Sequence, residues 1–135
     1  MNIVFDSNIF ISAFAIPRGQ AEKAILKAIA ENHSLIISKQ IMGEVLRILA
    51  AKFNKDKEMI SRTALFLSDL AHTVKTKRKV KVFKDDPDNR ILECALAGRA
   101  VLIVTGDKEM LRLKEFQGIK IISLREYLEL SSENH

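Results

Sequence analysis

Two kinds of hydrophobic pattern alternate along the chain. Short, mostly apolar runs, which are typical of strands buried on both faces, occur at residues 1–5, 35–37, 101–104 and 119–122. Between them, apolar residues recur at intervals of three or four, which predicts amphipathic helices over residues 20–30, 41–51, 60–70 and 87–99. Strands that alternate with helices in this way predict an α/β fold with a central parallel sheet covered on both faces.

The length of 135 residues fits one domain, which we expect over residues 1–130, followed by a frayed polar tail over 131–135. No apolar run approaches the ~20 residues of a membrane span, and the N-terminus lacks the features of a signal peptide. We therefore expect a cytoplasmic protein that does not contact membranes. Cys94 is the only cysteine, which excludes an intramolecular disulfide and a Cys-rich zinc site.

One segment concentrates the positive charge of a chain whose net charge is +5. The sequence KTKRKVKVFK holds six basic residues, namely Lys75, Lys77, Arg78, Lys79, Lys81 and Lys84. Alternating lysine and valine is typical of a protected edge strand, and a solvated loop would tolerate the same residues. A basic run also suits contact with nucleic-acid phosphates, so both interpretations stay open here.

Two acids follow predicted strands directly. Asp6 comes after the first apolar run, and Asp107 comes after the run 101–104 across a Thr105-Gly106 turn. Ligands of open parallel sheets bind beyond the carboxyl ends of the strands, so both carboxylates are expected on one rim of the sheet. Capping the helix that follows is the alternative role for each acid.

Two further acids lie on predicted helices. Glu44 falls at the border of the apolar stripe of helix 41–51. Asp88 shares a face with apolar residues of the helix whose start is marked by Asp85-Asp86-Pro87, with an acid as N-cap and proline at the first helical position. Asp88 is thus expected to point toward the sheet near the N-terminus of that helix.

Carboxylates that converge on one rim repel one another unless a cation lies among them. Ligation by carboxylates and water suits Mg²⁺ or Mn²⁺. The histidines at positions 33, 72 and 135 are scattered, which argues against zinc. The acids therefore predict a magnesium or manganese site.

Four segments together resemble the PIN domain, in particular the small prokaryotic PIN proteins of toxin–antitoxin pairs. They are IVFDSNIFISAF, SKQIMGEVLRIL, DDPDNRILECALAGRA and LIVTGDKEML, and the resemblance extends from residue 3 to about 128. It implies a three-layer α/β/α sandwich and a metal-dependent endoribonuclease. It also implies RNA as substrate, a cognate antitoxin as possible partner, and a homodimer or higher homo-oligomer.

The resemblance assigns roles to particular residues. The catalytic and metal-binding acids are Asp6, Glu44, Asp88 and Asp107. The supporting residues around them are Ser7, Asn8, Thr105 and Glu109. Relatives often read Asp-Pro-Asp-Asp-Asn before the helix, whereas this chain reads Asp85-Asp86-Pro87-Asp88-Asn89, so the match is anchored on the last two residues. Glu93 is interpreted as supporting or merely structural.

Competing functions make different demands on the sequence. A non-catalytic RNA-binding or assembly module of the same fold would be expected to have lost one of the acids, and this chain keeps all of them. A phosphoacceptor receiver domain requires paired acids after the first strand, but Asp6 is followed by Ser7. A dinucleotide-binding domain requires a G-x-G-x-x-G turn there, which is missing.

Overall fold

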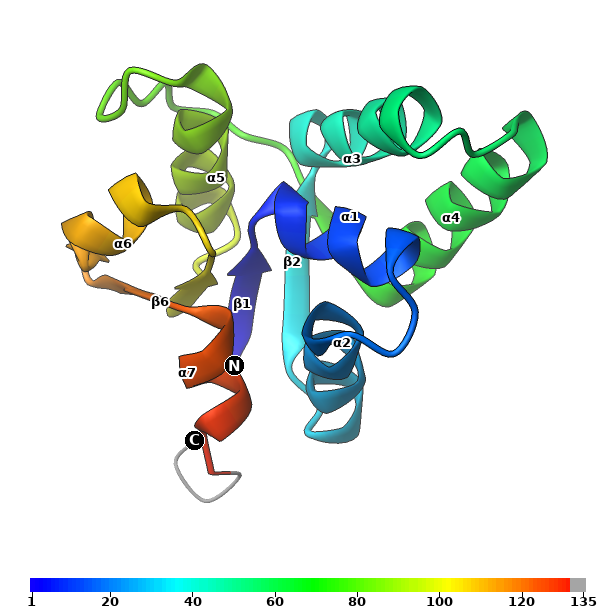
Figure 1. Cartoon of the computed structure of the whole chain (residues 1–135). Coiled ribbons are helices and arrows are strands. Elements are labelled where there is room, and N and C mark those ends of the chain that lie inside the picture. The colour runs from blue at the N-terminus through cyan, green and yellow to red at the C-terminus, as the bar shows by residue number, and fades with distance from the viewer. Residues whose placement is uncertain (132–135) are drawn as a thin grey trace.

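A six-stranded sheet organises the computed structural model, which describes residues 1–131 (Figure 1). The strand order is β3-β2-β1-β4-β6-β5. The strands are β1 (Asn2–Phe5), β2 (Ser34–Ser38), β3 (His72–Val74), β4 (Leu102–Val104), β5 (Glu115–Phe116) and β6 (Ile119–Ile122). All pairs are parallel except β5 with β6, so the predicted parallel sheet is confirmed and carries one antiparallel edge.

Helices cover both faces of this sheet. They are α1 (Ser7–Ala15), α2 (Gln20–Ala30), α3 (Lys39–Lys52), α4 (Lys57–Leu70), α5 (Asp86–Ala97), α6 (Lys108–Leu113) and α7 (Leu124–Glu129). The chain passes from β1 outward to β2 and β3, then returns through α5 to β4 on the other side of β1. Because parallel crossovers are right-handed, this reversal places α5 on the face opposite α1 and α2. The α/β/α layers predicted from the sequence are confirmed (Figure 1).

The core is built on the central strand β1. Ile3, Val4 and Phe5 are fully buried, as expected for a strand covered on both faces. The ring of Phe5 meets that of Tyr127 from α7 edge-on, with centroids 5.4 Å apart. On the other face, a Cβ added at Gly98 would lie 2.3 Å from Ile36 of β2. Glycine therefore lets the end of α5 approach the sheet closely.

The observed boundaries differ from the predicted ones in a few places. The N-cap of α5 is Asp85 rather than Asp86, and Pro87 is the second helical residue rather than the first. The elements β3, β5 and α7 were not predicted, because each is too short to show a period. Residues 132–135 of the predicted frayed tail lie outside the described part of the chain.

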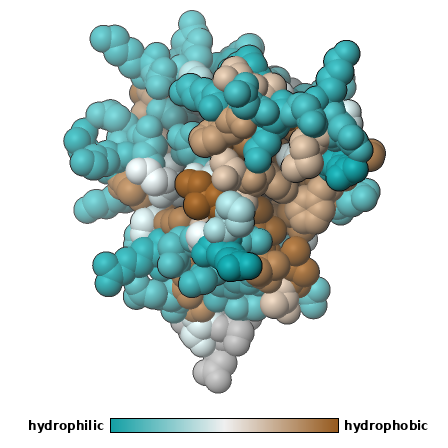
Figure 2. Space-filling model, turned by 45° about the vertical axis from the view of Figure 1, so that its right-hand side comes forward, coloured by the Kyte–Doolittle hydropathy of each residue, from teal (hydrophilic) through white to brown (hydrophobic). Residues whose placement is uncertain are grey.

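Hydrophobic side chains remain exposed on the side formed by α1 to α4. They include Ile16, Leu26, Phe53, Met59, Leu65 and Phe66. Figure 2 brings this side forward and shows brown and tan surface between the teal hydrophilic side chains. Within residues 1–131, no helix combines the length and the apolar character that crossing a membrane would require.

Candidate metal and nucleic-acid site

Asp6 stands at the junction of β1 and α1. The register of Phe5 opposite Val104 puts Asp6 beside Thr105, at the point where the chain topology reverses. Thr105 Oγ1 donates to Asp6 Oδ2 at 2.6 Å, and the backbone N–H of Asn8 donates to Asp6 Oδ1 at 3.2 Å. The carboxylate is only 4% exposed, and this burial raises its pKa more than its hydrogen bonds lower it. Neutral donors thus hold a buried acid at the rim.

Ser7 connects Asp6 to Glu44 on α3. Its hydroxyl lies 2.7 Å from Glu44 Oε2 and 3.3 Å from Asp6 Oδ1. One hydroxyl hydrogen serves one acceptor at a time, and the shorter distance assigns it to Glu44. The negative charge of half-buried Glu44 also contributes to the raised pKa of Asp6. The predicted border position of Glu44 therefore brings its carboxylate to the end of β1.

Asp107 follows β4 and begins α6. Its backbone N–H donates to Thr105 Oγ1 at 3.0 Å, so Thr105 connects Asp107 and Asp6 through one hydroxyl. Asp107 Oδ1 accepts from the backbone N–H groups of Glu109 and Met110, at 2.7 and 3.1 Å. Asp6 likewise caps α1 through Asn8. Each acid is therefore both a helix cap and a member of the rim, and capping occupies only one carboxylate oxygen of Asp107.

The pKa of Asp88 is affected by the charges of all these carboxylates. Burial raises its pKa first, and the negative charges of Asp107, Asp6, Asp85 and Glu44 add to this, bringing the pKa to about 6. Coulombic effects fall with distance, so these carboxylates share one region of the molecule. The basic residue next to them in sequence, Arg90, pairs with Asp86 and Glu93 instead. We call Asp6, Glu44, Asp88 and Asp107 the acidic cluster.

The acidic cluster fits a hard divalent cation in two respects. Its donors are carboxylate oxygens with unused lone pairs, and its charges repel in a partly buried setting. As the side chains stand, no three acidic, histidine or cysteine groups within residues 1–131 converge closely enough to coordinate one ion. Direct ligation of one cation by three of these carboxylates therefore requires them to draw closer together.

Two predicted supporting residues contact the cluster differently than expected. Glu109 is exposed, and its carboxylate pairs with Arg112 at 2.8 Å. Asn8 is exposed and reaches Asp6 through its backbone N–H, which any residue other than proline supplies. The supporting roles of these two side chains stay predictions.

The basic segment is a loop between β3 and α5. The edge-strand interpretation is wrong, because β3 ends at Val74 and residues 75–85 form neither strand nor helix. The side chains of the six basic residues are all exposed, in agreement with the solvated-loop interpretation. We call residues 75–85 the basic loop.

Two buried residues of α5 hold the basic loop in place. Asn89 Oδ1 accepts from the backbone N–H groups of Val82 and Phe83, at 3.0 and 2.8 Å, and Asn89 Nδ2 donates to the Phe83 carbonyl at 2.8 Å. Glu93 Oε2 accepts from the N–H of Val80 at 2.9 Å. The loop's backbone groups are thus bonded to side chains rather than to a neighbouring strand. Glu93 therefore has the structural role that was one of its two interpretations.

Sequence reasoning missed part of this arrangement. Asn89 and Glu93 lie four residues apart on one face of α5, and two polar residues spaced this way inside an apolar helix signal a buried polar anchor. Ser38 was also missed. It is fully buried at the end of β2, and its hydroxyl caps α3 by accepting from the N–H of Ile41 at 3.2 Å. A serine just before an apolar periodic run is the corresponding sequence signal.

Comparisons with known proteins agree with this architecture. The family model described as PIN domain matches residues 2–109. The uncharacterized protein MJ1680 of Methanocaldococcus jannaschii is 26% identical over 119 residues, which cover 85% of this chain and 76% of that protein. The crystal structure of VapBC2 from Rickettsia felis, bound to a DNA fragment from their promoter, superposes with a TM-score of 0.65 at 18% identity, covering 91% of this chain and 98% of that chain. The chain belongs to the PIN domain family.

Proposed function

We propose that this protein is a magnesium- or manganese-dependent endoribonuclease that hydrolyses RNA phosphodiester bonds in the cytoplasm. PIN domains are generally nucleases that use divalent metals, which supports the reaction class. The observation that carries the proposal is the arrangement of acids at the carboxyl ends of β1 and β4. There Ser7 lies between Asp6 and Glu44, and Thr105 connects Asp6 with Asp107.

Within this proposal, Asp6, Asp88 and Asp107 hold the cation directly or through water. Glu44 completes the site or orients the attacking water. The cation, when bound, makes a water more acidic and offsets charge on the phosphate. The chain's own hydroxyls prepare the ligands, since Thr105 fixes Asp6 and Ser7 fixes Glu44.

RNA would be held by the basic loop, whose exposed side chains at Lys75, Lys77, Arg78, Lys79, Lys81 and Lys84 suit phosphate contacts. The chain has no tryptophan and one buried tyrosine, and of its seven phenylalanines the exposed Phe53 and Phe66 lie on the α1 to α4 side rather than in the basic loop. Few exposed aromatic rings are therefore available for stacking on RNA bases, so selectivity should come from RNA shape and backbone position. Affinity should fall steeply with added salt.

We further propose that the protein is the toxin of a toxin–antitoxin pair and self-associates. The likeness to VapBC2 supports the pairing, and the exposed hydrophobic side chains on the α1 to α4 side offer apolar surface for a protein partner. Light scattering on the purified chain, alone and co-expressed with the product of an adjacent reading frame, measures both associations. A strictly monomeric chain that retains no partner contradicts them.

The test of the nuclease proposal is cleavage of a mixed RNA pool with Mn²⁺ or Mg²⁺, with EDTA, and by an Asp88→Asn variant. Asp69→Asn, which removes one exposed acid of α4, is the matched control. We expect metal-dependent cutting by the parent chain and by Asp69→Asn, and loss of cutting by Asp88→Asn. Undiminished cutting by folded Asp88→Asn would contradict the proposal. RNA that is bound but intact in every lane favours the non-catalytic binding module.

A further inference from the structure

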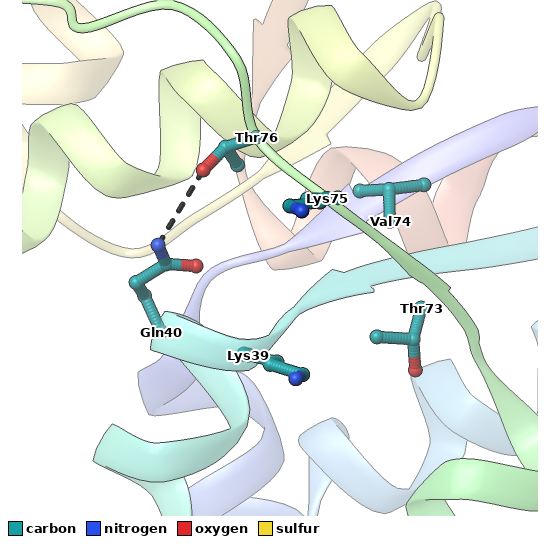
Figure 3. Close-up of a pocket in the computed structure, with 6 residues that line it drawn as sticks. All are labelled: Lys39, Gln40, Thr73, Val74, Lys75 and Thr76. Atoms are coloured by element: carbon teal, nitrogen blue, oxygen red, sulfur yellow. Dashed lines mark hydrogen bonds between the residues drawn. The ribbon is translucent and has the colours of Figure 1, made fainter.

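A cavity opens at the rim of the sheet where β2 and β3 end (Figure 3). Its volume is about 450 Å³, and it is lined by Lys39, Gln40, Thr73, Val74, Lys75 and Thr76. Two residues come from the start of α3, two from β3 and two from the start of the basic loop. Gln40 Nε2 donates to Thr76 Oγ1 at 3.4 Å across one side, as Figure 3 shows.

The lining of this cavity suits an anion. It offers two ammonium groups, two threonine hydroxyls and one amide, and none of the lining residues is acidic. Lysine is a common phosphate-binding residue, and hydroxyl groups donate readily to phosphate oxygens. No aromatic ring lines the cavity, so it lacks the surface on which a base would stack. The chemistry therefore favours a backbone phosphate over a base.

The position of the cavity relates it to the acidic cluster. The cavity lies at the ends of the neighbouring strands β3 and β2, and the cluster lies at the ends of the next two strands, β1 and β4. The two sites are thus two strand spacings apart. Adjacent strands are about 4.8 Å apart, so the two sites are separated by about 10 Å across the rim. The basic loop begins at the cavity with Lys75 and ends at the helix that carries Asp88. Positive charge thus connects the two sites.

We propose that this cavity is a phosphate subsite for the RNA strand, occupied by a backbone phosphate a short distance along the chain from the bond that is cut. The inference rests on the proposed ribonuclease function for the identity of the ligand. It adds Lys39, Thr73 and Thr76 to the RNA-contacting residues, and it gives the strand a direction across the rim, from the acidic cluster toward the β3 edge. Binding there is independent of base sequence.

The first arm of the test measures binding of a fluorescent oligouridylate in an Asp88→Asn background, which prevents cleavage. The Lys39→Ala/Lys75→Ala pair is compared with Lys57→Ala/Lys120→Ala, which removes the same charge from exposed sites elsewhere. We expect the cavity pair to raise Kd about tenfold and the control pair to leave it nearly unchanged. The slope of log K against log salt should become shallower by about 0.7 for every RNA phosphate that the variant no longer neutralises. Equal behaviour of the two pairs overturns the inference.

A second arm detects the subsite without catalysis or RNA. Inorganic phosphate is titrated into the ¹⁵N-labelled chain while the amide resonances of Lys39, Gln40 and Thr76 are followed. Saturable shifts that disappear in Thr73→Val/Thr76→Val support the subsite. No shift with phosphate, together with shifts from an oligoglutamate peptide, overturns it in favour of an acidic protein partner.

The two arms separate this inference from the proposed function. If the parent chain cleaves RNA and the cavity pair behaves like its control, the subsite is overturned and the nuclease stands. If the parent chain never cleaves RNA but the phosphate shifts and the weakened binding are present, the nuclease is overturned and the phosphate subsite stands.

Discussion

The acidic cluster and the basic loop lie at the same rim of the sheet and are held there in opposite ways. In the cluster, Asp6 and Asp107 follow strand ends, and hydroxyl groups bond to the carboxylates of Asp6 and Glu44. In the loop, side chains of α5 bond to the backbone, and the lysine and arginine side chains extend into solvent. The carboxylates of Asp6, Glu44 and Asp107 accept hydrogen bonds at their own oxygens, whereas the loop is held through its backbone.

This difference fits the two tasks we propose. A metal site depends on ligand position to within a fraction of an ångström, because bond lengths to the ion are fixed. Phosphate contacts by lysine tolerate movement, because the attraction is a charge effect with little directional demand. Hydrogen bonds thus restrain carboxylate oxygens where coordination is expected, and they restrain backbone groups where a flexible polyanion is expected.

The variant with the largest expected effect removes a charge from the acidic cluster and keeps the shape of the side chain. Asp6→Asn should lower the rate of metal-dependent RNA cleavage at least 100-fold, because a ligand is removed and not merely a supporting group. The control is Asp56→Asn, since Asp56 also caps a helix, α4, by accepting from Met59 N–H at 2.9 Å. If both variants cleave equally well, Asp6 acts only as a cap.

The next test removes a side chain of α5 that holds the backbone of the basic loop. Asn89→Ala deprives two N–H groups and one carbonyl of their partner, and it should lower the free energy of unfolding by about 2 kcal/mol. Denaturant unfolding measures this, and limited proteolysis should cut within residues 75–85. Lys81→Ala, which removes an exposed side chain of the same loop, should change neither the free energy of unfolding nor the protection of residues 75–85 from proteolysis. A protease-resistant Asn89→Ala loop would show that other contacts hold it.

A finer test concerns the hydroxyl that connects the two strand-end acids. Thr105→Val removes the donor to Asp6 and the acceptor for Asp107 N–H, and it should weaken Mn²⁺ binding about 10-fold by calorimetry. Thr105→Ser keeps the hydroxyl and should restore most of the affinity. Failure of serine to restore it assigns the effect to packing at this fully buried position.

The smallest expected effect is on the stability of the metal-free chain. The pKa of Asp88 is raised from 3.8 to about 6 in the folded state, so the native chain binds this proton more tightly than the unfolded chain. The free energy of unfolding should therefore fall as pH rises through the window from about 4 to about 6.

Asp88→Asn removes that dependence. Because Asp88 is only half-buried, the gain in stability of the variant at pH 7 should be small, about 2 °C in Tm. Excess Mg²⁺ should reverse the order and favour the parent chain, as followed by thermal melts with EDTA and with Mg²⁺. A parent chain that is the more stable one in EDTA contradicts the electrostatic account of the cluster.

Most of the fold could be predicted because its signals are local. The buried runs before Asp6 and before Thr105 predicted strands, and the apolar periodicity between them predicted helices; the structure confirms both. The placement of Asp6 and Asp107 on one rim also followed from topology, since parallel strands end on one rim. Capping a helix and joining the cluster are alternative roles for a rim acid in the sequence, and the structure shows both at once for Asp6 and Asp107.

The basic loop was the part that sequence patterns could not resolve. Alternating lysine and valine predicts a strand as readily as a loop, and the outcome depends on where the backbone finds hydrogen-bond partners. Those partners, Asn89 and Glu93, come from a different element, and only the packing of α5 on the sheet brings them within reach. Their burial depends on tertiary contacts, which a local pattern does not contain.

The anchoring of the basic loop also bears on how such a protein can diverge. Residues 77–79 lie between the proposed phosphate cavity and the first anchored residue, Val80, so a change of loop length there leaves both ends in place. The entropic cost of lengthening an exposed loop rises slowly with length. Under the proposed function, insertions or deletions in this short stretch would therefore alter which RNA shapes are accepted and would leave Asp88 in place.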